Sequence, residues 1–578
     1  MIESIRLAVF KAYTLARPYW TSDRKATAWT LLLSMATLLG TKVYLAALLS
    51  YAYADVFDLL DARDFDTILK NVIIFFSILA FLVIASVAEL HVRYMLTINW
   101  RQYLTDSYFI SYFSKSTFNQ VEQSKYGIDN PDQRIAEDIN IFATKTLSLG
   151  NGLLSNFGSL IAFSFILWTV SGDLPIPVAG RDIAIPGYMF WVAVIYAAIT
   201  TWITHITGKR LIPLKIEQQQ VEADFRFHLA RVREYSDSIA LSRGGAREHR
   251  DLTRDFSMIK ANWLHLLKFE SRILGVTLGF SYLSGFFPYL AALPALMAGT
   301  IAIGGLMQLS QAFGSVYTSL FWFARMYSNL ATWKASMDRI TLLDVAMKEA
   351  NTNRLSSKID CIPGGEERLC ISNLTITTPS GEVLFEQQSF QIAAGKNTIV
   401  TGPTGSGKST LFQAIAGHWL HGSGRIQLPA GKMEFLPQTA YLPKGSLRAV
   451  LAYPGQLEDH STEEFLSALQ KCKASHLMEQ LDKTQDWART LSGGEKQRLS
   501  IARVLLSRPD WLFMDESTSA IDPATENELL TMLFEELPST TFVSITHREP
   551  AASLYCTEIR FNRDLKLIEV TASSAKRN

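Results

Sequence analysis

A glycine-rich loop between a strand-like segment and a helix carries the strongest chemical signal in the sequence. Glycines let backbone amides curl around phosphate oxygens, and a helix that follows points its positive end at the same anion. The pattern predicts a P-loop that binds ATP, with Lys408 at the β and γ phosphates and Ser409 on Mg²⁺. The segment TIVTGPTGSGKST (398–410) also supplies Gly402, Pro403, Thr404, Gly405, Ser406, Gly407 and Thr410 as phosphate-binding residues.

Two adjacent acids end an apolar, strand-like segment, WLFMDE (511–516). Asp515 is expected to support Mg²⁺, as the acid at the end of a Walker B strand does. Glu516 follows directly and can polarise an attacking water as a general base. Such a run alone could end any strand, but beside a P-loop it indicates ATP hydrolysis.

A second phosphate-binding device lies upstream of these acids. The segment LSGGEKQRLSIARVLL (491–506) joins a Ser-Gly-Gly turn to an amphipathic helix. Ser492, Gly493 and Gly494 would present a hydroxyl and free amides at a helix N-terminus, where anions bind. Because the P-loop is already one such device, the second predicts that ATP is clamped between two surfaces.

Six stretches are long and apolar enough to be membrane spans, which need about 20 mostly apolar residues. The sixth is the most polar and carries Gln308, Gln311 and Ser319. It suits a helix that lines a wet cavity, or one whose polar side chains bond to neighbouring helices. The stretches lie at 26–53, 72–90, 153–170, 187–207, 273–299 and 306–326.

The charges around these stretches predict their orientation. Lysines and arginines gather before the first stretch and after the second and fourth, whereas the acids of Asp55–Asp66 follow the first. Because basic loops stay in the cytosol, both termini are expected there. Residues 1–25 interleave apolar and basic side chains, which fits either an amphipathic helix on the membrane surface or a solvated leader.

The composition agrees with a membrane protein of at least two domains. A chain of 578 residues is too long for one core, and only 19% of them are charged. The net charge of +1 gives no basic field, so no nucleic-acid partner is expected. The four cysteines lack metal-binding spacing and are interpreted as reduced thiols. We expect a surface helix at 1–25, a transmembrane domain at 26–340, a linker at 341–365 and an ATP-binding domain at 366–578.

The connections at 91–150 and 208–270 are expected to be helices that continue out of the membrane. Charged and apolar residues alternate there at helical spacing, and Gly244-Gly245 should interrupt the second connection. Asn130 can cap a short helix that has Pro131 in its first turn. Such a crosswise helix could carry force to another domain, or it could simply form a tight corner.

Together these motifs resemble the ATP-binding cassette (ABC) transporters. LSGGEKQR is similar to the family's signature, and Gln438, in EFLPQTAYLPKGSLR, is similar to its Q-loop glutamine. Asp522 in the string SAID resembles the D-loop, and His547 in VSITHRE resembles the switch histidine. The resemblance implies that Gln438 senses Mg²⁺ and that His547 contacts the γ-phosphate during catalysis.

The family resemblance also implies a fold and an assembly. The fold is an exporter-type α-helical bundle of six spans, followed by an α/β P-loop NTPase domain with a helical subdomain that carries the signature. Family cassettes pair head to tail, so each ATP sits between one P-loop and the partner's signature. A chain with one cassette should therefore act as a homodimer.

The sequence departs from the family pattern at the adenine base. Many cassettes stack adenine on a tyrosine just before a proline, but ITTPSGEVLF has Thr378 before Pro379. The aromatic platform is then either absent or supplied by another residue, such as Phe385.

Longer strings narrow the resemblance to one branch. DNPDQRIAEDI and EADFRFHLARVREYSDSIAL are similar to the branch of bacterial YddA-like and BacA/SbmA-related proteins and the peroxisomal subfamily D. Many peroxisomal members carry a long N-terminal extension that this chain lacks, which favours a bacterial inner-membrane protein.

The branch implies a choice of functions. Its members include importers of cobalamin and of hydrophilic peptides, and also fatty-acyl transporters. We expect an ATP-driven transporter that works by alternating access, in which cassette closure moves the helices at 127–138 and 235–248. Import of a hydrophilic compound is the preferred reading, and the alternatives are export of a lipid-like compound or an ATP-gated channel or regulator.

Overall fold

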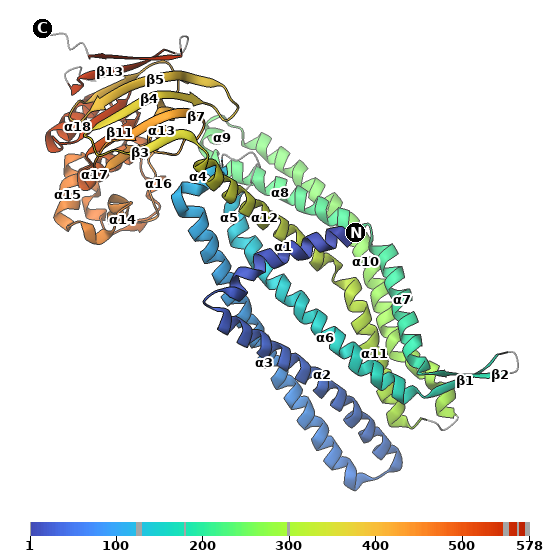
Figure 1. Cartoon of the computed structure of the whole chain (residues 1–578). Coiled ribbons are helices and arrows are strands. Elements are labelled where there is room, and N and C mark those ends of the chain that lie inside the picture. Colours follow the sequence, from blue (N-terminus) through green and yellow to red (C-terminus); the bar gives the residue numbers. More distant parts are fainter. Residues whose placement is uncertain are drawn as a thin grey trace. The chain divides into compact units, whose positions relative to one another are not determined.

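The chain folds into two units. The computed structural model describes residues 2–122, 130–178, 181–297, 301–546, 554–562 and 566–572. Met1–Tyr112 and Ile128–Val345 form a helical unit, and Phe113–Gly127 joins Ala346–Asn578 in an α/β unit. Figure 1 colours both units along the sequence.

Long helices make up the helical unit. Those that are long and apolar enough to cross a membrane are α2, α3, α6, α7 and α10, within the described part of the chain. The predicted sixth stretch is also a helix, α11, but it falls outside this set. The helices are α1 (Ile2–Thr21), α2 (Lys25–Ala62), α3 (Phe65–Phe113), α6 (Ile139–Ser171), α7 (Tyr188–Gly208), α8 (Leu211–Glu234), α9 (Ser236–Leu241), α10 (Gly245–Met297), α11 (Ile303–Arg325) and α12 (Tyr327–Leu355).

Helix α11 is polar because neighbouring helices surround it. It packs against α2, α6, α7 and α10. Phe313 and Val316 are completely buried there, and Gln308 and Ser319 are buried beside them. A helix that is enclosed by others faces little lipid, so polar side chains are tolerated on it.

The connections at the predicted outer side contain structure that the sequence did not predict. The proline-rich segment after α6 forms an antiparallel hairpin of β1 (Asp173–Val178) and β2 (Arg181–Pro186). The acids at the end of α2 are not all merely solvated, because an Asp58 carboxylate oxygen accepts a hydrogen bond from the Gly304 amide at 2.7 Å. This bond ties the end of α2 to the start of α11.

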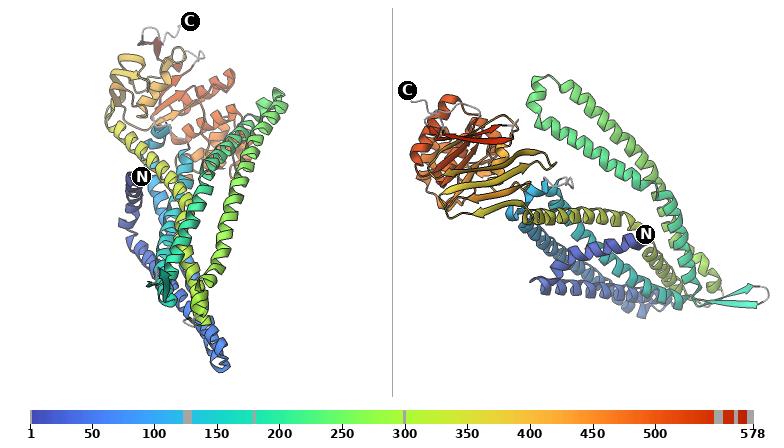
Figure 2. Two further views of the ribbon diagram at one scale, coloured as in Figure 1. Left: turned by 90° about the vertical axis from the view of Figure 1, so that its right-hand side faces the viewer. Right: turned by 45° about the horizontal axis from the view of Figure 1, so that its top comes forward.

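Helices α8 and α10 form a two-helix arm that α9 closes (Figure 2). The interruption at Gly244-Gly245 falls where it was expected, since α9 ends at Leu241 and α10 begins at Gly245. His228 on α8 joins the two helices. Its Nδ1 lies 2.8 Å from Asp255 Oδ2 and its Nε2 lies 3.0 Å from Glu248 Oε2, both on α10.

The arm should therefore become less stable as the pH rises. Hydrogen bonds first to Asp255 and then to Glu248 raise the pKa of His228 above its ordinary 6.5. A raised native pKa adds stability that is fully present below pH 6.5 and lost as the pH rises through the native pKa. His228→Gln should lower the melting temperature more at pH 6 than at pH 8, measured on the full chain in detergent. The exposed His249→Gln on α10 is the control, and a pH-independent effect of His228→Gln would contradict the ion-pair explanation.

The α/β unit contains two main sheets. A mixed sheet has the order β14-β13-β6-β12-β11-β8, and a second has the order β3-β7-β4-β5. The first comprises β14 (Leu567–Ala572), β13 (Thr557–Asn562), β6 (Thr398–Thr401), β12 (Thr541–Ile545), β11 (Trp511–Asp515) and β8 (Met433–Leu436). The second comprises β3 (Lys358–Pro363), β7 (Gly422–Leu428), β4 (Arg368–Thr377) and β5 (Val383–Ala393).

The strands β6, β12, β11 and β8 are parallel, and this arrangement builds a site at one edge. The side chains of β6, β12 and β11 are nearly all buried, as expected for parallel strands covered on both faces, whereas those of β8 at the edge of the sheet are mostly half-buried. The carboxyl ends of such strands lie together, and ligands bind beside them. The P-loop follows β6 and Asp515 ends β11, so the fold brings these two motifs to the same edge.

A short piece of the long connection after α3 belongs to the α/β unit. Helix α4 (Thr117–Glu122) lies there, and the Gln120 side-chain amide donates to the His418 carbonyl at 2.6 Å. Arg354 also donates to the Lys115 carbonyl. The segment around 131–138 belongs to the helical unit, and whether it carries force to another domain or forms a tight corner stays a prediction. Asn130 does precede a helix that begins at Pro131, but its side chain makes no capping bond.

Candidate functional site

The P-loop is held in its curved shape by backbone conformations that favour glycine. Gly402 has φ of +141° and Gly407 has φ of +95°. A side chain at Gly402 would also lie 2.7 Å from the Cβ of Phe561, which leaves no room for one. Helix α13 (Lys408–Ile415) begins directly after the loop, so its free amides face the loop's concave side.

Two buried side chains of the loop are suited to a phosphate. Lys408 is 6% exposed, and its ammonium donates to the carbonyls of Gly402 at 2.7 Å and Pro403 at 3.0 Å. Burial lowers the pKa of Lys408. The hydroxyl of Ser406 is buried, and it has no hydrogen-bond partner in the described part of the chain. An anion in the loop would satisfy this hydroxyl and give the ammonium a charged partner.

The acids at the end of β11 meet the P-loop. The Ser409 hydroxyl bonds to the Asp515 carboxylate, while burial raises the pKa of Asp515. Glu516 accepts a hydrogen bond from the Gln438 amide at 3.0 Å. The structure thus gathers Ser409, Asp515, Glu516 and Gln438 on one side of the loop. A hydroxyl beside a carboxylate is an all-oxygen set of the kind that Mg²⁺ prefers.

The backbone at Glu516 is strained. Its φ of +48° lies in the left-handed region, which non-glycine residues seldom adopt. A hydrogen bond from its amide to the Ile545 carbonyl, at 3.0 Å, fixes this conformation. Such strain is retained mainly where function requires a particular side-chain direction. His547, two residues beyond Ile545, lies outside the described residues.

The signature turn is an N-cap with a complete capping box. Ser492 precedes α17 (Gly493–Ser507), and its hydroxyl donates to Glu495 Oε2 at 2.7 Å. This bond, above all, lowers the pKa of Glu495 to about 2. Within the described residues the Ser492 hydroxyl bonds only to Glu495 and not to the P-loop.

The signature helix is tied to the D-loop. Gln497 accepts from the Ala520 amide at 2.8 Å and donates to the Ser519 hydroxyl at 3.3 Å. A side chain at Gly494 would lie 3.1 Å from the Ala520 carbonyl, so this close approach favours glycine. Asp522 caps α18 (Pro523–Glu536) by accepting from the Thr525 amide at 3.0 Å. The Asp522 side chain thus bonds to the start of α18 in its own chain and not to the P-loop.

The suggestion that Phe385 stacks on adenine is wrong. Phe385 is 1% exposed and packs edge-on against Phe561, with the ring centres 5.6 Å apart. Another aromatic residue, Trp419, which the motifs did not indicate, lies at the end of the hairpin formed by β4 and β5. The Trp419 indole donates to the carbonyls of Thr377 at 3.0 Å and His421 at 3.1 Å. Trp419 follows α13 in the sequence, and no motif spacing identifies it.

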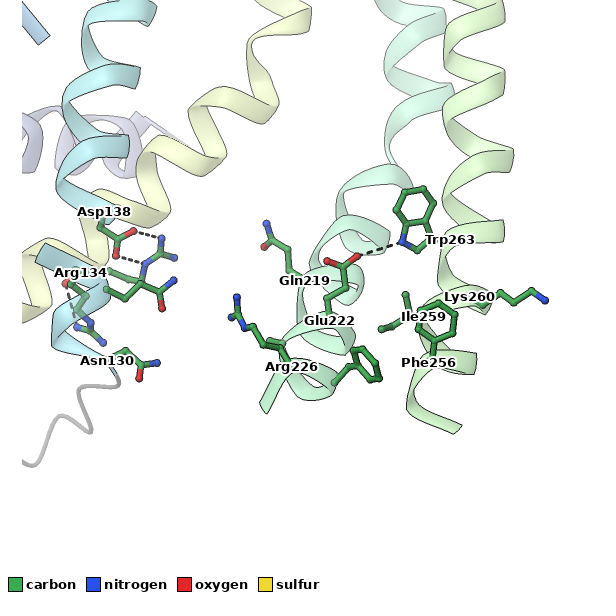
Figure 3. Close-up of a pocket in the computed structure, with 14 residues that line it drawn as sticks. Asn130, Arg134, Asp138, Gln219, Glu222, Arg226, Phe256, Ile259, Lys260 and Trp263 are labelled. Carbon is green, nitrogen blue, oxygen red and sulfur yellow. Dashed lines mark hydrogen bonds and ion pairs between the residues drawn. The ribbon is translucent and has the colours of Figure 1, made fainter. Parts of the chain in front are cut away.

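The helical unit contains a cavity of about 1100 Å³ that the sequence did not reveal. Its two walls face each other in Figure 3, one from the segment 130–138 and one from α8 and α10. Arg339, which bonds to Asp138, also lines the cavity. Trp263 donates to Glu222 at 3.4 Å on the second wall. The lining is mostly charged or amide-bearing, with three aromatic rings: Asn130, Gln133, Arg134, Asp138, Arg339, Gln219, Glu222, Arg226, Lys260, Phe225, Phe256 and Trp263.

Comparisons with known proteins cover nearly the whole chain. Residues 15–297 match the family model for ABC transporter transmembrane region 2, and residues 385–519 match the ABC transporter model. The inner membrane ABC transporter ATP-binding protein YddA of Escherichia coli is 32% identical over 94% of this chain and 96% of its own length. The chloroplastic ABC transporter D family member 2 of Arabidopsis thaliana is 28% identical over 98% of this chain and 87% of its own. The human lysosomal cobalamin transporter ABCD4 is 26% identical over 79% of this chain and 78% of its own length.

Proposed function

The chain belongs to the ABC transporter family, and from that premise we propose that it imports a large hydrophilic solute, such as a cobalamin or a peptide, across a bacterial inner membrane. Its C-terminal part is an ATPase coupled to transport of a solute. The observation that supports the choice of solute is the cavity of about 1100 Å³ in the helical unit, whose charged and amide-bearing lining comes mainly from the helical connections that we expect to continue out of the membrane. A hydrophilic solute can exchange its water hydrogen bonds for those groups, whereas an acyl chain cannot.

The roles proposed for the ATP site follow from its contacts. Lys408 and the P-loop amides bind the phosphates, and Ser409 with Asp515 would hold Mg²⁺. That ion would neutralise charge that develops on the phosphates during transfer. Glu516 accepts the proton of the attacking water, and the hydrogen bond from the Gln438 amide to one of its carboxylate oxygens helps to orient that carboxylate.

A homodimer is proposed because the P-loop and the signature turn, the two halves of the expected ATP site, form no hydrogen bond with each other in the described part of one chain. The Ser492 hydroxyl is engaged with Glu495, and its turn packs against the D-loop of its own chain. A second copy arranged head to tail would bring its own Ser492, Gly493 and Gly494 to the phosphates. Binding of two ATP molecules then closes the pair and shifts the helical units between two states. We place both termini in the cytosol and α1 on the membrane surface.

Transport assays in sealed proteoliposomes test the proposal. The full chain is reconstituted, and uptake of cyanocobalamin and of a labelled hydrophilic peptide is measured with ATP trapped inside or added outside. The Glu516→Gln variant serves as the inactive control. Uptake that requires internal ATP means movement toward the cassette side, which is the import expected here.

Each other outcome contradicts part of the proposal. Uptake that requires external ATP would establish export. ATPase activity without uptake of either compound would reject both solutes and favour a lipid-like passenger. Solute flux that persists without hydrolysis in Glu516→Gln would favour an ATP-gated channel.

A further inference from the structure

A small cavity of about 300 Å³ lies between α3 and α6, apart from both sites described above, and polar and basic residues line it together with Tyr94 and Ile98. On α3 its lining residues Arg93, Thr97 and Arg101 are spaced four apart and so share one face of the helix. On α6, Asn140, Thr144 and Ser148 repeat the same spacing and face them. The cavity is therefore lined by two arginines from α3 and by an asparagine, a threonine and a serine from α6.

The positive charge of this cavity is only partly compensated. Glu89, whose side chain is 6% exposed, lies 3.1 Å from the Lys42 ammonium and 3.5 Å from Arg93 Nε, so two cations share its carboxylate. Arg93 Nε is buried and makes no hydrogen bond within the described residues. Arg101 donates to the Ala136 carbonyl at 3.3 Å, and that acceptor carries no charge. The Arg93 guanidinium shares one carboxylate with Lys42, and Arg101 has only a neutral acceptor, so the cavity keeps positive charge and favours an anion.

The cavity lies where the apolar parts of both helices end. The apolar run of α3 ends at Leu90, just before Arg93, and that of α6 begins after Ser148. Large apolar side chains on the membrane side of the cavity are exposed, among them Val87 at 63%, Leu154 at 53% and Phe157 at 57%. The exposed ring of Tyr94 borders the cavity itself. This combination of a basic pocket below an apolar surface matches a phospholipid at the headgroup level.

We infer that this cavity binds the phosphate of an anionic phospholipid, with its acyl chains along the exposed faces of α3 and α6. The phosphate oxygens accept from Arg93 and Arg101, and the glycerol and headgroup hydroxyls bond to Asn140, Thr144 and Ser148. A lipid bound between α3 and α6 would stabilise the packing of these two helices against each other. The direct contacts between these two helices include the rings of Trp100 and Phe142, whose centres are 5.6 Å apart. The two helices are drawn in blue and cyan in Figure 1.

Binding is measured on the delipidated full chain in detergent by native mass spectrometry. The probe is dioleoyl phosphatidylglycerol, and parallel titrations use dioleoyl phosphatidylcholine and inorganic phosphate. Arg101→Gln removes one charge and should weaken phosphatidylglycerol binding about fivefold, because one basic group contributes about a factor of five at a membrane surface. Thr144→Leu fills the mouth of the cavity at an exposed position and should also weaken binding without changing the charge.

Arg210→Gln is the matched control, since it removes an exposed basic residue near the predicted end of another span, outside the cavity. Unchanged ATPase activity verifies that each variant is folded. The inference is overturned if Arg101→Gln and Thr144→Leu bind phosphatidylglycerol as the wild type does, or if phosphatidylcholine binds equally well. Binding of inorganic phosphate without the lipid would overturn the assignment to a phospholipid. It would also be overturned if lipid binds only to a separated monomer, because a second copy would then cover the cavity.

Discussion

Glu516→Gln is expected to lower the steady-state ATPase rate by about 10²–10⁴-fold, the usual contribution of a positioned general base. The amide that replaces the carboxylate keeps the shape of the side chain but cannot take a proton from water. The new amide can still form a hydrogen bond with Gln438, and the substitution does not alter the contact between Ser409 and Asp515. ATP should therefore still bind, and the paired cassettes should accumulate in the closed, ATP-bound state.

The measurement combines turnover with nucleotide retention. Phosphate release gives the rate, and ATP that remains bound after rapid gel filtration gives the occupancy of the site. Glu479→Gln, an exposed acid of the same α/β unit, should change neither quantity. A Glu516→Gln variant that hydrolyses ATP within a few-fold of the wild-type rate would assign the base to another group.

Arg339→Met is expected to destabilise the helical unit by about 2–3 kcal/mol. Arg339 on α12 holds Asp138 with two parallel hydrogen bonds, from Nε to Oδ2 at 2.8 Å and from Nη2 to Oδ1 at 2.5 Å. The Asp138 side chain is only 4% exposed, so the variant leaves a buried carboxylate without this partner. Loss of a buried pair by removal of one partner costs about 3–5 kcal/mol, and the lower value here reflects the half-exposed guanidinium.

The adjacent residue on α12 provides the control. Asp338 pairs with Lys11 at 2.7 Å, but both side chains are partly exposed to solvent, so Asp338→Asn should cost about 1 kcal/mol or less. Thermal unfolding of the full chain in one detergent at fixed pH compares the two variants. Equal shifts in melting temperature would show that burial of Asp138 does not govern its contribution.

The motifs of the proposed ATP site were predictable because each is local. A P-loop needs glycines at fixed offsets between a strand and a helix, and Gly402 and Gly407 adopt the positive φ that this requires. A capping box likewise depends on residues three apart, as in Ser492 and Glu495. Short-range geometry of this kind is encoded in consecutive residues and does not depend on distant packing.

The contacts that were missed join residues far apart in the chain. No local pattern predicts that Gln120 bonds to the loop after α13, or that Trp419 reaches the end of the β4 hairpin. The error at Phe385 has the same origin, since a phenylalanine after a turn can face either solvent or the core. Only its packing against Phe561 decides which.

By itself, the sequence determined the order of the parts: apolar helices first, and then a P-loop, a signature turn and a Walker B strand. Hydrophobic run length and the offsets within each motif are properties of consecutive residues, so they could be read directly. The tertiary structure alone decided which side chains meet across helices, as in the large cavity and in the pocket of Arg93 and Arg101. Such cavities depend on the relative rotation and tilt of packed helices, which side-chain packing along their whole length sets and which no single segment encodes.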